Sequence, residues 1–137
     1  MSEYDIISFP GSHLPRGYVN MIFAKWLRSF KYGNDYFRLM DNDAYFKNYS
    51  RQVSWILNQA DCSVRLAVLH DDHDVCLGFC VYRDTILDYI HVQRDMRNIG
   101  IGTALMPEGI KVITHITKYV LEVWHKSYPE VRFNPFT

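Results

Sequence analysis

Apolar residues recur every three or four positions through the first part of the chain, which is the spacing of one face of an α-helix. This period predicts amphipathic helices over residues 17–30 and 42–61. Their apolar faces consist of Val19, Ile22, Phe23, Trp26, Leu27 and Phe30 in the first, and Tyr45, Tyr49, Val53, Ile56 and Leu57 in the second. Gly33 is expected to end the first helix. Either Asn42 or Asp43 is expected to cap the second, because a short polar side chain accepts hydrogen bonds from the free N–H groups of a first turn.

The pattern then changes to short runs rich in β-branched and aromatic residues, which predict strands. Runs over 63–70 and 75–83 flank the charged turn 71–74 and indicate an antiparallel hairpin, and residues 86–92 form the next strand. A short helix follows and ends at Pro107, because proline cannot continue a helix. The remaining elements are expected to be strands over residues 4–8, 111–117 and 131–136, and a helix over 118–128.

Length and composition are those of a single packed unit. With 137 residues and no repeat or low-complexity segment, residues 1–137 are expected to fold as one domain. The residues are 48% hydrophobic, 15% aromatic and 22% charged, with zero net charge. This balance excludes a disordered acidic chain and a polycation built to bind nucleic acid.

Cysteine usage and the N-terminus bear on location. The three cysteines, Cys62, Cys76 and Cys80, are an odd number without a repeated C-x-x-C spacing, which disfavours a disulfide framework and a zinc site. The N-terminus lacks a basic start followed by an apolar run, and no stretch approaches the roughly 18–20 apolar residues that a membrane helix needs. We therefore expect a cytoplasmic protein without a membrane partner.

The segment HDDHD, residues 70–74, has side chains of metal-ligand type. Its length is that of a hairpin turn, in which adjacent aspartates are usually solvated. No metal site is expected there.

Two glycines stand between the strand over 86–92 and the short helix, within the segment VQRDMRNIGIGTAL at residues 92–105. A strand that enters a helix through glycines leaves several backbone N–H groups unpaired and pointing the same way, with the positive end of the helix dipole behind them. Such a place binds anions, most often phosphate.

This segment resembles the pyrophosphate-binding motif of the GCN5-related N-acetyltransferases (GNATs), in which a strand-ending valine is followed by R/Q-x-x-G-x-G/A and a helix. Val92 holds the strand-end position, Arg97 the R/Q position, and Gly100 and Gly102 the two small positions. The predicted order of elements is also similar to that family over nearly the whole chain. The resemblance implies an α/β (α+β) fold of the GNAT type, with a mixed, mostly antiparallel twisted sheet and helices on both faces. A dinucleotide-binding fingerprint is disfavoured, because it requires a third glycine where Leu105 stands.

The resemblance implies an acyl-CoA-dependent N-acyltransferase, which moves an acetyl or similar group from acetyl-CoA to a primary amine by direct attack, without a metal. The coenzyme pyrophosphate would lie on the backbone of Arg97, Asn98, Ile99, Gly100, Ile101, Gly102 and Thr103. The thioester would lie along the preceding strand, where a backbone N–H of Ile90, His91 or Val92 would bind its carbonyl oxygen. The alternative is a glycine-rich helix cap that binds nothing.

Two residues are candidates for the base that takes the proton of the amine. Asp88 lies four residues before Val92, and alternation along a strand places it on the same face as Ile90 and Val92; in the alternative it is solvated or paired to Arg83. His115 lies on the strand after the short helix, and in GNATs this strand diverges from its neighbour to leave a gap for the acyl donor. In the alternative, His115 is a hydrogen-bonded core residue.

The acid that returns a proton to the leaving thiolate is a tyrosine of the last helix in many GNATs. Trp124 or His125 stands near the corresponding position of this chain. Tyr119 and Tyr128 lie nearby but out of register, and Tyr119 is the candidate.

The acceptor is expected between residues 31–46 and the C-terminal strand, where GNATs bind their variable substrates. An amine acceptor is expected to use the acidic residues of this region, Asp35, Asp41 and Asp43. A nucleic acid, the less favoured partner, is expected to use the nearby basic residues Lys25, Arg28, Lys31 and Arg38.

Three short segments are similar to small phage-encoded members of this family: a W-L-R-S helix, a T-H-x-T strand and an N-P-F/Y end, here residues 26–29, 114–117 and 134–136. For such a member the location is the host cytoplasm, and an alternative function is the modification of a nucleic-acid base. A further alternative is a catalytically inactive GNAT that binds coenzyme or a partner. We expect a monomer or a homodimer.

Overall fold

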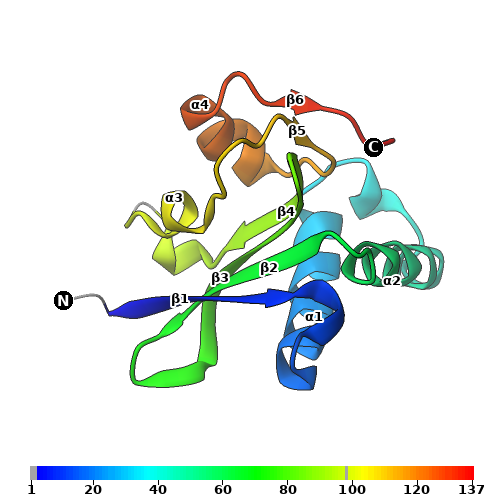
Figure 1. Ribbon diagram of the computed structural model, residues 1–137. Helices are drawn as coiled ribbons and strands as arrows, with labels where there is room; N and C mark the ends of the chain where they lie inside the picture. Colours follow the sequence, from blue (N-terminus) through cyan, green and yellow to red (C-terminus); the bar gives the residue numbers. More distant parts are fainter. Residues whose placement is uncertain (1–2, 98) are drawn as a thin grey trace.

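The structure is a computed structural model that describes residues 3–97 and 99–137 (Figure 1). Within these residues it contains one sheet of six strands in the order β1 to β6. The strands are β1 Tyr4–Pro10, β2 Cys62–Leu69, β3 Asp72–Arg83, β4 Ile86–Val92, β5 Val112–Ile113 and β6 Arg132–Phe133. Strands β1 to β4 pair antiparallel, whereas β5 pairs parallel to β4 and β6 parallel to β5. The sheet is mixed and mostly antiparallel, as predicted.

Helices pack on both faces of this sheet, as predicted. They are α1 Arg16–Tyr32, α2 Asn42–Leu57, α3 Ile101–Leu105 and α4 His125–Ser127, with 3-10 turns η1 Gly11–His13, η2 Phe37–Leu39 and η3 Arg94–Met96 and a π turn η4 Val120–Trp124 that leads into α4. On one face, Trp26 of α1 and Val53 of α2 pack with Tyr89 of β4. On the other face, Ile101 of α3 packs with Ile90 of β4. None of the helices in residues 3–97 and 99–137 is both long enough and apolar enough to span a bilayer.

The predicted elements of the N-terminal half match the structure closely. Helix α1 ends at Gly33, and β4 has the predicted bounds. The cap of α2 is Asp41 rather than Asn42 or Asp43, since its side chain accepts a hydrogen bond from the N–H of Ala44 at 3.1 Å. The prediction was one residue late because three short polar residues in a row can each serve as a cap.

The C-terminal strands are shorter than predicted over 111–117 and 131–136, because β5 and β6 contain two residues each. Pairing of β5 with β4 stops at Ile113, and one further bond joins the N–H of Thr114 to the carbonyl of Leu87 at 3.0 Å. The chain then leaves the sheet. His115 therefore lies in a loop, which corrects the prediction that it lies on a strand.

Strand β4 carries a β-bulge. Val81 of β3 pairs with Tyr89, but the next residue, Tyr82, pairs with Leu87, so Asp88 has no opposite partner. A bulge of this kind breaks the two-residue alternation of side chains along a strand.

The bulge turns Asp88 away from Ile90 and Val92. Those two side chains pack in the cluster that contains α3, whereas the Asp88 carboxylate bonds Arg83. The Arg83 guanidinium in turn lies 5.4 Å from the ring centre of Trp55 on α2. The predicted common face of Asp88 with Ile90 and Val92 is wrong, because the prediction assumed an unbroken strand.

Candidate functional site

Strand β4 and the chain that follows β5 separate after Leu87 and Thr114. A cavity of about 310 Å³ lies between them, and we call it the strand gap. It is lined by Ser29, Tyr32, Gly33, Tyr89, Ile90, His91, Arg94, Arg97, Thr117, Lys118 and Tyr119. One wall is thus the second half of β4, and the other is the segment 117–119.

The edge of β4 that faces the strand gap carries backbone N–H groups. The N–H of Gln93 donates to β3 at 2.9 Å, and alternation along the strand turns the N–H groups of Ile90 and Val92 to the opposite edge. On that edge the carbonyl of Val92 accepts a bond from Arg97 Nε at 3.2 Å. Ile90, which lines the strand gap, therefore directs its N–H to this edge, and Val92 does so beyond the lining, whereas the N–H of His91 faces β3.

His91 lines the strand gap with its side chain. Burial, helped by the positive charges of Lys25 and Arg97, lowers the pKa of His91 from 6.5 to about 4. The imidazole is therefore neutral at pH 7 and adds no charge to this wall.

The two motif glycines are needed for different reasons. Gly100 has φ +88°, a left-handed conformation that favours glycine. Gly102 lies against Tyr119, since a Cβ there would be 2.8 Å from the tyrosine hydroxyl. Ile101 is almost fully buried, and its side chain packs in the core. Asn98, which was also predicted for this loop, lies outside the described residues.

We call residues 99–103 the glycine turn. Tyr119 connects it to the strand gap. It lines the strand gap and also a smaller cavity of about 160 Å³ bounded by Gly100, Gly102 and Thr103. The guanidinium of Arg97 lies 4.4 Å from the centre of its ring. Burial raises the pKa of Tyr119, against the opposing effect of Arg97, so the phenol keeps its proton at neutral pH.

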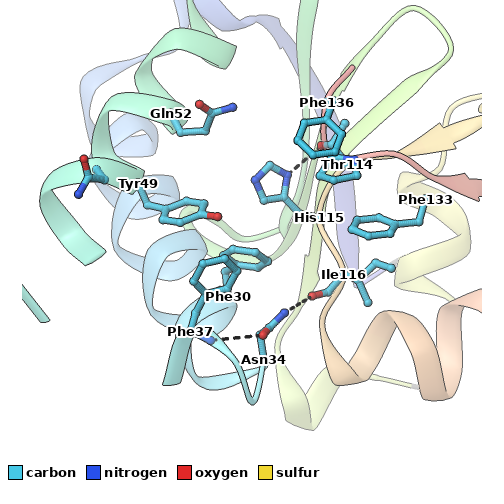
Figure 2. Close-up of a pocket in the computed structure, with 12 residues that line it drawn as sticks. Phe30, Asn34, Phe37, Tyr49, Gln52, Thr114, His115, Ile116, Phe133 and Phe136 are labelled. Carbon is cyan, nitrogen blue, oxygen red and sulfur yellow. Dashed lines mark hydrogen bonds between the residues drawn. The ribbon is translucent and has the colours of Figure 1, made fainter. Parts of the chain in front are cut away.

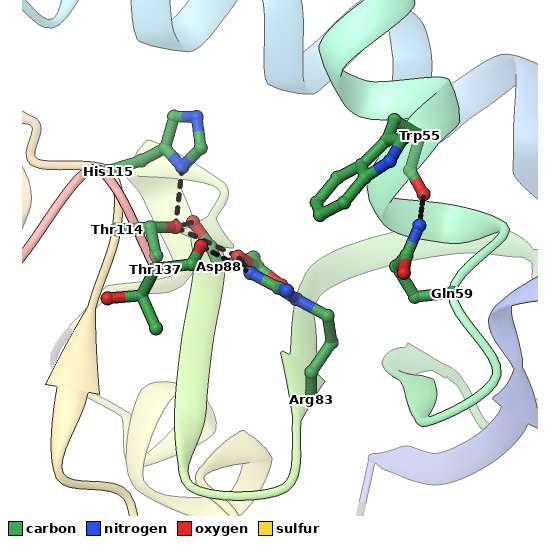
Figure 3. Close-up of polar contacts among 7 residues, drawn as sticks. All are labelled: Trp55, Gln59, Arg83, Asp88, Thr114, His115 and Thr137. Atoms are coloured by element: carbon green, nitrogen blue, oxygen red, sulfur yellow. Dashed lines mark hydrogen bonds and ion pairs between the residues drawn. The ribbon is translucent and has the colours of Figure 1, made fainter.

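Asp88 is fully buried and bonded on both carboxylate oxygens (Figure 3). Arg83 donates from Nε to Oδ2 at 2.6 Å and from Nη2 to Oδ1 at 2.8 Å. The hydroxyl of Thr114 lies 2.9 Å from the same Oδ1. The pairing to Arg83 that the sequence left as an alternative is thus the arrangement found.

The same hydroxyl fixes the tautomer of His115. Thr114 Oγ1 lies 2.8 Å from His115 Nδ1 (Figure 3). Both oxygens of Asp88 accept from Arg83, and Thr114 donates its single hydroxyl proton to Asp88. The hydroxyl oxygen must then accept from Nδ1–H of His115, which leaves the lone pair on Nε2.

The imidazole of His115 stands among aromatic rings and is 7% exposed. Its ring centre lies 5.5 Å from that of Trp26, 4.9 Å from Phe30 and 6.3 Å from Tyr49, all edge-to-face or steeply inclined. Burial lowers the pKa of His115 to about 4, and Asp88 opposes this shift only in part. The group is a neutral hydrogen-bond acceptor at pH 7.

A larger cavity of about 520 Å³ opens beside His115 (Figure 2). We call it the aromatic pocket; it is lined by Phe30, Asn34, Phe37, Asn48, Tyr49, Gln52, Thr114, His115, Ile116, Phe133, Pro135 and Phe136. Its walls come from the end of α1, from α2, from the loop after β5 and from the C-terminal segment. None of these lining residues is an Asp, Glu, Lys or Arg.

The aromatic pocket and the strand gap are neighbours. Asn34 and Ile116 line the first, and the adjacent residues Gly33 and Thr117 line the second. Two hydrogen bonds join the segments that line both cavities, from Asn34 Nδ2 to Ile116 O at 3.3 Å and from Lys118 N to Gly33 O at 2.9 Å.

No family model and no curated protein sequence matches this chain. Among solved structures it is similar to the "Putative acetyl transferase" of Pyrococcus furiosus, with a TM-score of 0.62 and 16% identity over 96% of this chain and 80% of that one. The chain has the GNAT fold.

Other similar structures match less closely. One is apo YjaB from Escherichia coli, with a TM-score of 0.48 and 20% identity over 74% of this chain and 60% of that one. Another is a "putative gnat family acetyltransferase" from Staphylococcus aureus, with a TM-score of 0.46 and 15% identity over 94% of this chain and 97% of that one.

Within the GNAT fold, the predicted residues fall into two groups. Tyr119, Arg97 and the backbone of Ile90 and Val92 gather at the strand gap and the glycine turn. His115 lies at the aromatic pocket, and Asp88 lies beneath it, connected through Thr114.

The charged residues predicted for the acceptor do not line the aromatic pocket. Asp35 is exposed and pairs with Lys118 at 3.2 Å, and Asp41 caps α2. Lys31 is buried, with its ammonium bonded to the carbonyl of Arg38 at 3.1 Å. The pocket is built from aromatic and amide side chains, of which Asn34 and Phe37 lie in the segment 31–46 predicted for the acceptor, and Phe133 and Phe136 lie in the predicted C-terminal strand.

The predicted turn over 71–74 is tighter in the structure, where β3 already begins at Asp72. His70 and His73 both contact the carboxylate of Asp5, at 3.1 Å and 2.8 Å. In the described part of the chain no three metal-ligating side chains come together as a site.

Proposed function

We propose that this protein is an acyl-CoA-dependent N-acyltransferase that transfers an acetyl or similar group to a primary amine by direct attack. The observation that carries the proposal is that β4 and β5 separate at the strand gap, while β4 leads through the short turn η3 into the glycine turn. A thioester and its phosphates can therefore lie along one continuous wall. The GNAT fold supports this assignment, and the similar protein of Pyrococcus furiosus is named as an acetyl transferase.

The coenzyme fits these residues as follows. The pyrophosphate lies on backbone N–H groups of the glycine turn, on the open side of Gly100, where a Cβ would meet no described atom within 4 Å. The side of Gly102 that faces Tyr119 is already filled. The thioester lies in the strand gap, and its carbonyl oxygen accepts from the N–H of Ile90 or Val92. Such a donor stabilises the negative charge that develops on this oxygen during attack.

His115 acts as the base through Nε2. The amine nitrogen forms a bond to the thioester carbonyl carbon, the carbon–sulfur bond breaks, and the electron pair leaves with the coenzyme sulfur. One amine proton passes to Nε2, which holds a lone pair because Nδ1–H is bonded to Thr114. A positioned base of this kind contributes about 10²–10⁴ in rate.

Asp88 and Thr114 position this base without touching the substrate. Asp88 has no exposed surface and both of its oxygens are bonded, so it has no route to an amine. It acts through the hydroxyl of Thr114, which holds one imidazole tautomer. The predicted role of Asp88 as the proton acceptor thus becomes a positioning role in this proposal.

Tyr119 supplies the proton that the leaving thiolate takes up. Its hydroxyl lies between the strand gap and the glycine turn, next to the path of the coenzyme. The raised pKa keeps the phenol protonated until a thiolate forms beside it. Solvent then restores the tyrosine proton and removes the proton from His115, so the sum of the steps is an amide and a free thiol.

Titration calorimetry with acetyl-CoA tests this function. Gly102→Val brings a side chain against Tyr119 and narrows the turn, and we expect it to weaken acetyl-CoA binding at least tenfold. Gly17→Ala is the matched control, because a Cβ there meets no described atom within 4 Å. Absence of acetyl-CoA binding to the wild type, or equal affinity in both glycine variants, contradicts the proposal.

A further inference from the structure

The aromatic pocket is lined by five aromatic rings and by uncharged polar groups. The rings are Phe30, Phe37, Tyr49, Phe133 and Phe136, and the polar side chains are Asn34, Asn48, Gln52, Thr114 and His115. A volume of about 520 Å³ is in the range of sites that hold one small molecule, roughly 300–1,000 Å³. The lining therefore suits a small apolar body with a few polar atoms on its edge.

Two of these rings are exposed although they belong to a segment that is held in place. Phe133 is 52% exposed and Phe136 is 94% exposed. The segment between and after them is anchored by polar contacts, from Asn134 N to Ile113 O at 3.0 Å and from Arg83 Nη2 to Thr137 O at 3.2 Å. Aromatic rings at the mouth of a cavity still expose apolar surface to water. An apolar ligand that covers them removes this surface from water, which contributes binding free energy.

The polar groups are placed for the edge of such a ligand. Asn34 is already engaged, because its Nδ2 donates to Ile116 O and its Oδ1 accepts from the N–H groups of Tyr36 and Phe37. Figure 2 shows the amide of Gln52 and the hydroxyl of Tyr49 directed toward the space beside His115. Among residues 3–97 and 99–137 neither group has a side-chain hydrogen-bond partner, so both can bond polar atoms on the edge of a planar ring system.

The absence of ionised groups from this lining argues against a polycationic acceptor. The three aspartates of the neighbouring segment lie elsewhere, on the surface or at the cap of α2. An ammonium group that entered the aromatic pocket would meet ring faces but no carboxylate, so the lining gives a polyamine no counter-charge for its several ammonium groups.

We propose that the aromatic pocket binds the acceptor as a flat, uncharged aromatic molecule whose primary amino group is directed at His115. This inference rests on the proposed function, since it names the substrate class of the same site. Phe133 and Phe136 stack on or flank the acceptor ring, and Gln52 and Tyr49 bond its edge. An aromatic amine is already uncharged at neutral pH, so His115 has only to take the proton that attack releases.

Ligand binding without coenzyme tests this inference separately from acyl transfer. The probe is 4-aminobenzamide, and the controls are spermidine and 4-aminocyclohexanecarboxamide, which keeps the amide but carries an ammonium and is neither flat nor aromatic. Saturation-transfer NMR and titration calorimetry are expected to detect 4-aminobenzamide and neither control. Binding of spermidine in preference to 4-aminobenzamide, or equal binding of the two carboxamides, overturns the inference.

Two ring deletions locate the binding. Phe133→Ala and Phe136→Ala remove side chains that are at least half exposed, so the fold is expected to survive. Each should weaken 4-aminobenzamide binding about threefold to tenfold, the range of a lost aromatic contact. Leu121→Ala, which removes an exposed apolar side chain of η4 outside the pocket lining, is the matched control. Unchanged affinity in both phenylalanine variants overturns the assignment.

The two proposals fail in different ways. Binding of 4-aminobenzamide to a protein that does not bind acetyl-CoA supports the pocket assignment and contradicts the transferase. If the protein binds acetyl-CoA but does not bind 4-aminobenzamide, the acceptor class is contradicted and the proposed acyltransferase function is not.

Discussion

The hydroxyl oxygen of Thr114 lies 2.8 Å from Nδ1 of His115. Because the proton of that hydroxyl is directed to the buried Asp88 carboxylate 2.9 Å away, the imidazole must donate from Nδ1 and present its lone pair at Nε2. A carboxylate without any exposed surface thus determines which nitrogen faces the aromatic pocket. Proton transfer to His115 depends on this arrangement.

Loss of the imidazole should slow catalysis and leave coenzyme binding intact. His115→Ala is expected to lower kcat about 10²–10⁴-fold for any acceptor that the wild type acetylates, because the base is removed. The dissociation constant for acetyl-CoA should stay within about twofold, since His115 does not line the strand gap. His125→Ala, at an exposed histidine of α4, is the control. A kcat reduced by less than threefold in His115→Ala would eliminate it as the base.

Loss of the Thr114 hydroxyl should allow both neutral tautomers of His115. Thr114→Val keeps the shape of the side chain but cannot accept from Nδ1–H, and kcat should fall about 10–100-fold, as for other residues that orient a catalytic group. The ¹⁵N NMR shifts of His115 should change from a single Nδ1–H tautomer to a mixture. Thr114→Ser, which keeps a hydroxyl, should restore both kcat and the single Nδ1–H tautomer. An unchanged tautomer in Thr114→Val would show that the hydroxyl does not set it.

Loss of the Asp88 charge should destabilise the fold. Asp88→Asn leaves the buried Arg83 guanidinium without its counter-charge, and the free energy of unfolding is expected to fall by about 3–5 kcal/mol. Urea denaturation measures this change. Asp35→Asn is the matched control, because Asp35 pairs at the exposed surface, where such a pair contributes roughly 0–1 kcal/mol. Equal costs in the two variants would contradict a buried pair.

Acid should destabilise the protein through its two buried histidines. Burial holds the pKa of His91 and His115 near 4, against 6.5 in the unfolded chain. Between these values the unfolded chain binds protons that the folded chain does not, so stability is retained above about pH 6.5 and is lost as the pH falls toward 4. Each histidine contributes up to about 1.4 kcal/mol per pH unit.

Unfolding curves across this pH range test the effect. The charged groups that act on His115 are Asp88 and Arg83, and those that act on His91 are Lys25 and Arg97. His91→Asn and His115→Asn should each reduce the pH slope by about one proton. If neither substitution changes the slope of the free energy of unfolding against pH, the two imidazoles are hydrated in the folded state.

The parts of the fold that could be predicted are those set by local pattern. The period of apolar residues is enough to place α1 with its end at Gly33, and a run of β-branched and aromatic residues is enough to place β4 at residues 86–92. The glycine turn was also predictable, because a left-handed conformation such as that of Gly100 favours glycine.

The parts that could not be predicted depend on partners far away in the sequence. The bulge at Asp88 is defined by the register with β3, so a rule of strict alternation along β4 misplaces its carboxylate. The aromatic pocket joins Phe30 and Tyr49 to Phe133, which lies more than eighty residues later. A helical period correctly places Tyr49 on an inner face, but it cannot distinguish a residue that fills the core from one that lines a cavity.

The most direct test of the acyl-CoA assignment is the response of individual backbone amides to acetyl-CoA in ¹H–¹⁵N NMR. We predict large shifts for Ile90 and Val92 on the gap edge of β4 and for residues 99–103 of the glycine turn, and none along β1 at Tyr4–Pro10, on the far edge of the sheet. Shifts confined to other residues, or no shifts at saturating acetyl-CoA, would contradict the account.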